Sequence, residues 1–145
     1  LGRLVGTNLG ISAPALEAHI GHPPTTDEMK ALTPEVAAEI YRGYWAAVKA
    51  GQIINRDVAA LLFDMAVNHG PTSAIRAAQR VAGVKPDGKM GPVTLAAINR
   101  KGPTEMIGRL VGARVALYKS LTDRNPMLKA FYAGWIRRAE SFLPE

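Results

Sequence analysis

Carboxylates are the side chains best suited to hydrolytic chemistry in this sequence, which has no cysteine and only three histidines. Asp64 is distinctive among the twelve acidic residues, because it lies within an otherwise apolar stretch that has helical periodicity. Asn68 follows four residues later, so the two polar side chains share one face of the predicted helix. Two interpretations are open: Asp64 is buried and ties a neighbouring loop by hydrogen bonds, or it lines a cleft as part of a functional site.

The other acidic and imidazole side chains favour structural roles. Glu39 falls on the polar side of its predicted helix, where Arg42, three residues later, pairs with it in solvent. His69, at the predicted end of a helix, is placed to stabilise the helix dipole. His19 and His22 lack the spacing of a metal site, and the sequence has neither a nucleophile elbow nor a glycine-rich phosphate-binding fingerprint. We therefore expect no catalytic metal and no cofactor.

Three of the few aromatic residues, Tyr41, Tyr44 and Trp45, cluster within five positions. Aromatic faces suit the apolar faces of sugar rings, and their polar tips bond hydroxyl groups. Core packing is the alternative interpretation for Tyr44 and Trp45. Tyr41 is the candidate for a cleft.

The segment from Gly6 to Ser12 places a Thr-Asn pair between two glycines. This composition predicts tight turns that present short polar side chains close to a bound molecule. Thr7, Asn8 and Gly10 are therefore candidate binding residues.

Helical periodicity extends over almost the whole chain. The predicted helices must therefore position these candidate residues. Apolar residues recur every three or four positions, and nothing alternates at period two for more than a fragment of strand. The segment 83–92 has glycine or proline at five of its ten positions and is predicted to be a structured loop. We expect an all-α fold of six or seven helices, at residues 14–20, 33–50, 55–69, 72–82, 93–100, 104–121 and 127–142.

Composition describes an ordinary globular protein, with 145 residues, 48% hydrophobic and 21% charged. No apolar run approaches the roughly 20 residues that a membrane span needs, so we expect no transmembrane segment. The net charge of +6 favours polyanions such as nucleic acid or anionic cell wall. Basic residues are scattered without a dedicated tract, which argues against a nucleic-acid-binding protein. We expect a monomer.

Taken in order, these pieces resemble the glycoside hydrolase family 108 muramidases, which include bacteriolytic phage endolysins and bacterial lysozymes of the putative secretion activator type. Order and spacing agree over nearly all of the chain. The matching features are Thr7-Asn8-x-Gly10-Ile11, Leu32-Thr33 with Glu39-Ile40-Tyr41-Arg42, Ala60-Leu61-x-Phe63-Asp64-x-Ala66-Val67-Asn68-x-Gly70-Pro71, Gln79-Arg80, Gly83-Val84, Asp87-Gly88-x-x-Gly91-Pro92-x-Thr94-Leu95, and the region of Trp135.

The resemblance implies a lysozyme-like helical fold in two closely packed lobes. Residues 1–54 would form a muramidase lobe, and residues 55–145 a helical lobe like the family's peptidoglycan-binding region. The implied reaction is hydrolysis of the β-1,4 bond between N-acetylmuramic acid and N-acetylglucosamine in peptidoglycan glycan strands. The residues expected to bind the substrate, or to brace the loop that does, are Thr7, Asn8, Gly10, Tyr41, Asp64 and Asn68.

One departure from the family pattern concerns the catalytic acid. In the family it is the Glu of a Glu-Gly-Gly-Tyr motif about fourteen residues before the Thr-Asn pair, and it protonates the departing glycosidic oxygen. Only six residues precede Thr7 here, so that lobe is truncated and the motif is missing. We expect the 145-residue chain to be inactive as a muramidase, with Asp64 the candidate for a substitute acid. The alternative is a non-catalytic peptidoglycan-binding or structural module.

The first residues carry no basic segment followed by an apolar stretch, so no signal peptide is visible. We expect synthesis in the cytoplasm and action in the periplasm or at the cell wall.

Overall fold

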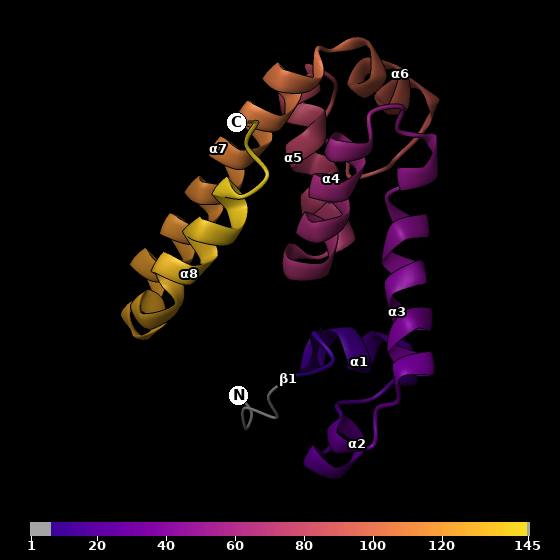
Figure 1. Cartoon of the computed structure of the whole chain (residues 1–145), viewed down its shortest axis with the longest axis vertical. Helices are drawn as coiled ribbons and strands as arrows, with labels where there is room; N and C mark the ends of the chain where they lie inside the picture. The colour runs from indigo at the N-terminus through magenta and orange to yellow at the C-terminus, as the bar shows by residue number, and fades with distance from the viewer. Residues whose placement is uncertain (1–6, 145) are drawn as a thin grey trace. The chain divides into compact units, whose positions relative to one another are not determined.

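The computed structural model describes residues 7–144, which form eight α-helices, two 3-10 helices and one two-stranded sheet (Figure 1). The expected all-α class is confirmed. In chain order the elements are β1 (Thr7–Asn8), β2 (Ile11–Ser12), α1 (Ala13–Ile20), α2 (Thr26–Lys30), α3 (Pro34–Ala47), η1 (Ala50–Gln52), α4 (Arg56–His69), α5 (Pro71–Ala82), α6 (Pro92–Arg100), α7 (Pro103–Arg124), η2 (Pro126–Leu128) and α8 (Lys129–Glu140).

The chain divides into two compact units, the first ending at Ala46 and the second beginning at Ala47. The unit boundary falls at the last turn of α3. The assignment of a muramidase role to one lobe and a wall-binding role to the other stays a prediction.

The first unit is built around one apolar cluster, to which β2 and the first three helices contribute. Its buried members are Ile11, Ala15, Leu16, Met29, Ala37 and Ile40. Helix α2 was not expected from the periodicity, because five residues are too few to show it. Its start has a local signal nonetheless: Thr25 and Glu28 form a reciprocal capping box, with both hydrogen bonds at 3.1 Å.

Helix α3 ends three residues earlier than the sequence indicates. The backbone of Lys49 adopts a left-handed conformation, with φ of 49°, and the chain continues into η1. Val48 and Ala50 on either side are buried. Burial of these two side chains therefore favours a turn here over continuation of the helix to Gly51.

Helix α4 is the centre of the second unit and packs against α5 and α7. Its residues Leu61, Leu62, Met65 and Ala66 have no exposed surface and recur at the three-to-four spacing of one helix face. Helix α6 packs on α5.

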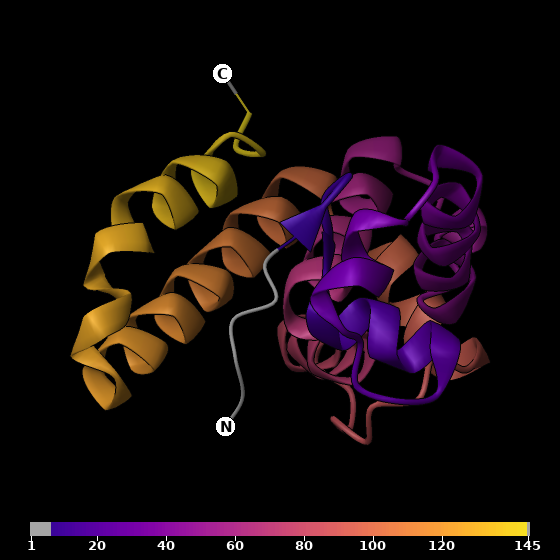
Figure 2. The same ribbon diagram turned by 90° about the horizontal axis from the view of Figure 1, so that it is seen from below.

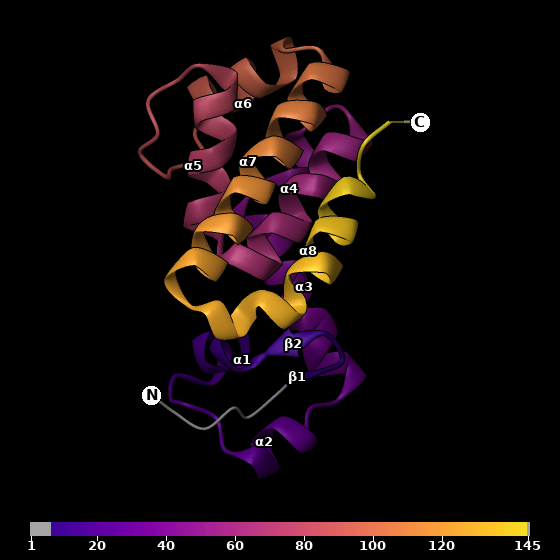
Figure 3. The same cartoon turned by 90° about the vertical axis from the view of Figure 1, so that its left-hand side faces the viewer.

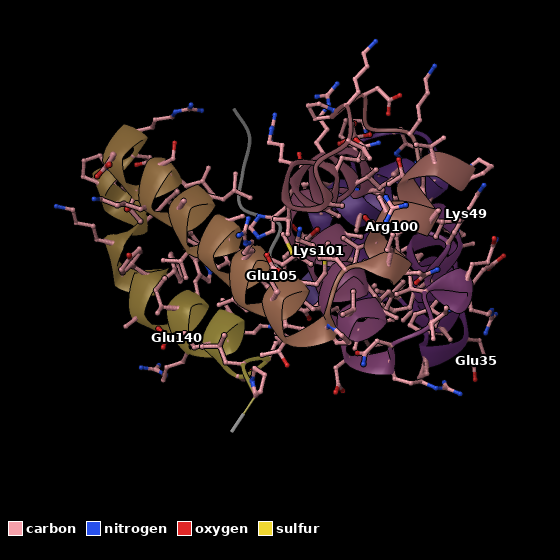
Figure 4. All side chains as sticks on the ribbon, turned by 90° about the horizontal axis from the view of Figure 1, so that it is seen from above. Glu35, Lys49, Arg100, Lys101, Glu105 and Glu140 are labelled. Carbon is pink, nitrogen blue, oxygen red and sulfur yellow. The ribbon has the colours of Figure 1, made fainter. Side chains whose placement is uncertain are left out.

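Helices α7 and α8 form a helical hairpin (Figure 2). Asn125 ends α7 and caps η2, because its side chain accepts a hydrogen bond from the backbone N–H of Met127 at 3.2 Å. At the start of α7, Glu105 pairs with Lys101 at 3.7 Å (Figure 4). It also pairs with Arg109 at 3.0 Å. Among residues 7–144, no helix has both the length and the hydropathy to cross a membrane.

Candidate functional site

The Thr-Asn segment forms a tight hairpin in the first unit. Thr7 pairs with Ser12 and Asn8 with Ile11 across two antiparallel strands. The two turn residues, Leu9 and Gly10, both have positive φ, at 53° and 77°. Positive φ at both central positions is the geometry that matches strand twist in two-residue hairpins. Leucine rarely adopts it, so the surrounding contacts must hold this turn in place.

Tyr41 from α3 supplies the contact that holds the turn. Its hydroxyl donates a hydrogen bond to the carbonyl of Leu9 at 2.9 Å. The same hydroxyl would collide with a Cβ placed on Gly10, at a separation that no real side chain tolerates. Glycine is therefore required at position 10 both by its φ and by the approach of Tyr41.

Asn8 ties the hairpin to α2. Its side-chain amide donates to the carbonyl of Met29 at 3.0 Å, near the carboxyl end of that helix. Ser12, at the other end of the hairpin, caps α1 by accepting from Ala15 N–H at 3.3 Å. Thr7 is exposed on the surface of the unit. Four of the six predicted binding residues, namely Thr7, Asn8, Gly10 and Tyr41, thus lie together in one hairpin and the helix that clamps it.

Asp64 and Asn68, the other two predicted residues, lie on α4 in the second unit. Asn68 donates from its side chain to the backbone carbonyl of Asp64 at 2.8 Å, and lies 3.4 Å from one carboxylate oxygen. The two residues therefore share a helix face, as their spacing predicts.

The carboxylate of Asp64 is held by two arginines that the sequence analysis did not single out. Nη1 of Arg114, on α7, lies 2.6 Å from Oδ2 of Asp64. Nε of Arg138, on α8, donates to both carboxylate oxygens at 3.1 and 3.2 Å, and its Nη2 also contacts Oδ1. Both oxygens of this buried carboxylate are thus occupied by guanidinium groups. This geometry favours a role in holding α7 and α8 on α4 over donation of a proton to a substrate.

Arg114 is itself completely buried, which is unusual for a charged side chain. Its Nε donates to the hydroxyl of Tyr118 at 3.0 Å, and its guanidinium lies over the rings of Tyr118 and Phe142, at 5.5 and 5.9 Å from their centroids. Its Nη2 has no hydrogen-bond partner among the residues that the structure describes. The Asp64 carboxylate is therefore what compensates its charge.

His69 adjoins this cluster, with its ring 5.0 Å from that of Tyr118. Burial lowers the pKa of His69 to about 4, and the charge of Arg114 adds to the effect against the opposing carboxylate of Asp64. The imidazole is consequently neutral at neutral pH. The expectation that it stabilises the helix dipole as a cation is wrong, because desolvation outweighs that attraction.

The glycine-rich loop between α5 and α6 is organised by one buried side chain, Gln79. Its Nε2 lies 2.8 Å from Oδ1 of Asp87, 3.0 Å from the carbonyl of Lys89 and 3.0 Å from Oγ1 of Thr94. Its Oε1 accepts from Gly88 N–H at 2.9 Å. Hydrogen bonds from the Lys89 backbone and from Gln79 hold the pKa of Asp87 below its usual value. The polar side chains of Gln79, Asp87 and Thr94 thus hold the loop in its conformation.

Within the described part of the chain, no three histidine or acidic residues are grouped closely enough to hold a metal ion. The candidate features are therefore the hairpin held by Tyr41 in the first unit and the helical bundle held by the Asp64 ion cluster in the second.

Comparison with known proteins identifies a family for each half of the sequence. The model of the glycosyl hydrolase 108 family matches residues 5–70, and a family model described as a predicted peptidoglycan domain matches residues 73–140. The structure of Brucella abortus SagA is 34% identical with a TM-score of 0.85, over 94% of this chain and 76% of that chain. The chain belongs to the glycosyl hydrolase 108 family. No match was found among curated proteins.

The two family models of this peptidoglycan-related muramidase family divide the chain into successive regions, which meet at the first turn of α5. The packing divides it elsewhere, because α4 belongs to the second unit. Asp64 lies in the glycosyl hydrolase region, while Arg114 and Arg138 lie in the peptidoglycan region. The buried ion cluster therefore joins the two family regions of the chain.

Proposed function

We propose that this protein acts on the glycan strands of peptidoglycan as part of a muramidase, whose reaction is hydrolysis of the β-1,4 bond between N-acetylmuramic acid and N-acetylglucosamine. The observation that carries the proposal is the glycosyl hydrolase 108 match followed directly by the peptidoglycan-domain match along one chain. The site of action is the periplasm or the cell wall.

In this proposal the hairpin contacts the glycan. Thr7 is exposed at its edge, while Asn8, Gly10 and Tyr41 hold the turn in a fixed conformation. A fixed turn presents its hydroxyl and backbone groups to a sugar without an ordering cost on binding.

Asp64 and Asn68 have a positioning role in the same proposal. They hold α4, α7 and α8 together through Arg114 and Arg138 rather than touching the glycan. Glycoside hydrolysis needs a carboxylic acid beside the departing oxygen, and the residues described here supply none that matches the family's Glu. In this proposal the described residues bind and position peptidoglycan.

The distribution of charge along the chain also supports peptidoglycan as the partner. Residues 47–145 contain fifteen Lys and Arg against seven Asp and Glu, a net charge of +8, whereas residues 1–46 have three against five, a net charge of −2. The basic residues are therefore concentrated in one unit, which corrects the impression of an even scatter. Long-range attraction draws such a unit to anionic wall material.

The test is sedimentation with purified peptidoglycan sacculi, with turbidity and released reducing ends scored in the same tubes. We expect the 145-residue chain to sediment without clearing the suspension. The same chain extended by a helix with a Glu-Gly-Gly-Tyr motif ahead of Thr7 should clear it, and a Gln in place of that Glu is the matched control.

Failure of both proteins to sediment would overturn the proposal. Clearing by the 145-residue chain itself would show that a carboxylate within it serves as the acid. Asp64→Asn, shown to be folded by circular dichroism, would then abolish clearing if Asp64 were that group.

A further inference from the structure

Helices α5 and α7 lie side by side in the second unit (Figure 3). A groove lies between their side chains. The groove has a volume of about 420 Å³, within the usual range of ligand pockets. From α5 it is lined by Ser73, Arg76, Ala77, Arg80 and Val81, and from α7 by Ala113, Ala116, Leu117 and Ser120. The small side chains of Ala77, Ala113 and Ala116 are what leave the space between the helices open.

Two arginines stand one helical turn apart along the α5 side of this groove. Like charges at this spacing repel each other, so Arg76 and Arg80 destabilise the isolated helix slightly unless an anion lies between them. Neither forms an ion pair with an acidic side chain within residues 7–144. Both are exposed at the groove.

The neighbouring loop restricts Arg76. A Cβ on Gly88 would lie 2.8 Å from Cγ2 of Thr72 and 3.3 Å from Nε of Arg76, so the guanidinium lies close against the loop backbone. Gly88 is in turn held by Gln79 through its N–H. The buried Gln79 therefore holds in place the loop backbone that Arg76 contacts.

A second hollow, of about 400 Å³, lies at the start of α4, where the side-chain amides of Asn55 and Asn99 are already hydrogen-bonded. Asn55 caps α4, and Asn99 bonds the backbone of Ile54 and of Gln52. The α5–α7 groove differs because it is lined by two arginines and by no carboxylate, whereas Asp57 lines the other hollow.

We propose that the α5–α7 groove binds the stem peptide of peptidoglycan, with Arg76 and Arg80 paired to its carboxylates. Stem peptides are short, rich in alanine and carry several free carboxylates. The alanine methyl groups fit the small-residue floor, and guanidinium groups bind carboxylates in a bidentate manner. No aromatic side chain lines the groove, so it lacks the flat surface that would favour a sugar ring. This inference rests on the proposed function, because it names the part of peptidoglycan that the second unit holds.

The experiment measures binding of the 145-residue chain to three soluble probes by calorimetry and by amide chemical shifts. The probes are a disaccharide-tetrapeptide with free carboxylates, the same compound with its carboxylates amidated, and the disaccharide alone. We expect the first to bind and to shift amides of α5 and α7. Amidation should weaken binding about tenfold or more, because it removes charge-assisted hydrogen bonds.

The variant Arg76→Gln/Arg80→Gln should show the same loss. Arg100→Gln/Arg124→Gln removes two charges from the same unit outside the groove and is the matched control. Ala113→Leu, which fills the floor while keeping both arginines, should also weaken binding. Circular dichroism confirms that each variant is folded.

Sedimentation with sacculi stripped of other wall polymers distinguishes failure of the proposed function from failure of the groove assignment. If the wild-type chain does not sediment, the proposed function fails and the groove assignment fails with it. If it sediments but the disaccharide alone binds equally well, or amidation and the arginine pair make no difference, only the groove assignment is overturned. Sedimentation without detectable binding of the tetrapeptide compound at millimolar concentration also overturns it.

Discussion

Asp64 and Arg114 form an ion pair in which the arginine has no exposed surface and the two charged atoms lie 2.6 Å apart. They are 50 residues apart in the chain and belong to different family regions. Removing one member of a buried pair is strongly unfavourable, because the other charge is left without compensation. The pair therefore couples α4, the last helix of the glycosyl hydrolase region, to α7 in the peptidoglycan region.

Asp64→Asn should destabilise the protein by about 3–5 kcal/mol, since Arg114 then stays buried without its counterion. Urea unfolding followed by circular dichroism measures the change. Asp57→Asn, in the exposed first turn of the same helix, is the control and should cost below about 1 kcal/mol. A loss for Asp64→Asn no larger than the control's would contradict this role.

Gly10→Ala should cost more than about 2 kcal/mol of stability, from its left-handed φ and from collision with the Tyr41 hydroxyl. Tyr41→Phe alone should cost about 0.5–1.5 kcal/mol through the lost hydrogen bond to Leu9.

The two changes should not be additive. Without the hydroxyl, the next atom of Tyr41 lies 3.6 Å from the added Cβ, an ordinary contact. Gly10→Ala is therefore expected to cost less in the Tyr41→Phe background, and a double-mutant cycle by thermal unfolding measures the difference. Strict additivity would mean that Tyr41 does not restrict position 10.

His69 should make the protein less stable as the pH falls. Its pKa in the folded protein is about 4, below the value of about 6.5 in the unfolded chain. The unfolded state therefore binds the proton first, so the stabilisation present above about pH 6.5 is lost as the pH falls toward 4. His69→Gln removes this titration, and its unfolding free energy should depend less steeply on pH across that window. Equal pH profiles for the two proteins would exclude His69 as the cause.

Gln79→Ala should release the loop between α5 and α6 and lower stability by about 1–3 kcal/mol, because it leaves buried polar groups of the loop without partners. Hydrogen exchange of the Gly88 amide, which loses its acceptor, should become faster. Lys85→Ala, an exposed change in the same loop, serves as the control and should leave that exchange rate unaltered.

Local patterns in the sequence were sufficient for most of the helices and for the tight turn at Gly10. Apolar spacing and helix-ending glycines and prolines predict the positions of α3 to α8 within a few residues, because these signals act within one or two turns of the chain. The short helix α2 escaped the periodicity, although its capping box at Thr25 and Glu28 was a signal that could have found it. The pairing of Asp64 with Asn68 also follows from spacing alone.

The sequence by itself therefore determined which segments are helical, which turn needs glycine, and which family the order of motifs resembles. Only the tertiary structure decided which cations meet Asp64, since Arg138 lies 74 residues away and no local signal distinguishes it from the other arginines. The same holds for the contact of Tyr41 with a turn 32 residues earlier, and for the neutral state of His69, which results from burial. Contacts between distant segments depend on how whole helices pack, and a pattern of neighbouring residues does not contain that information.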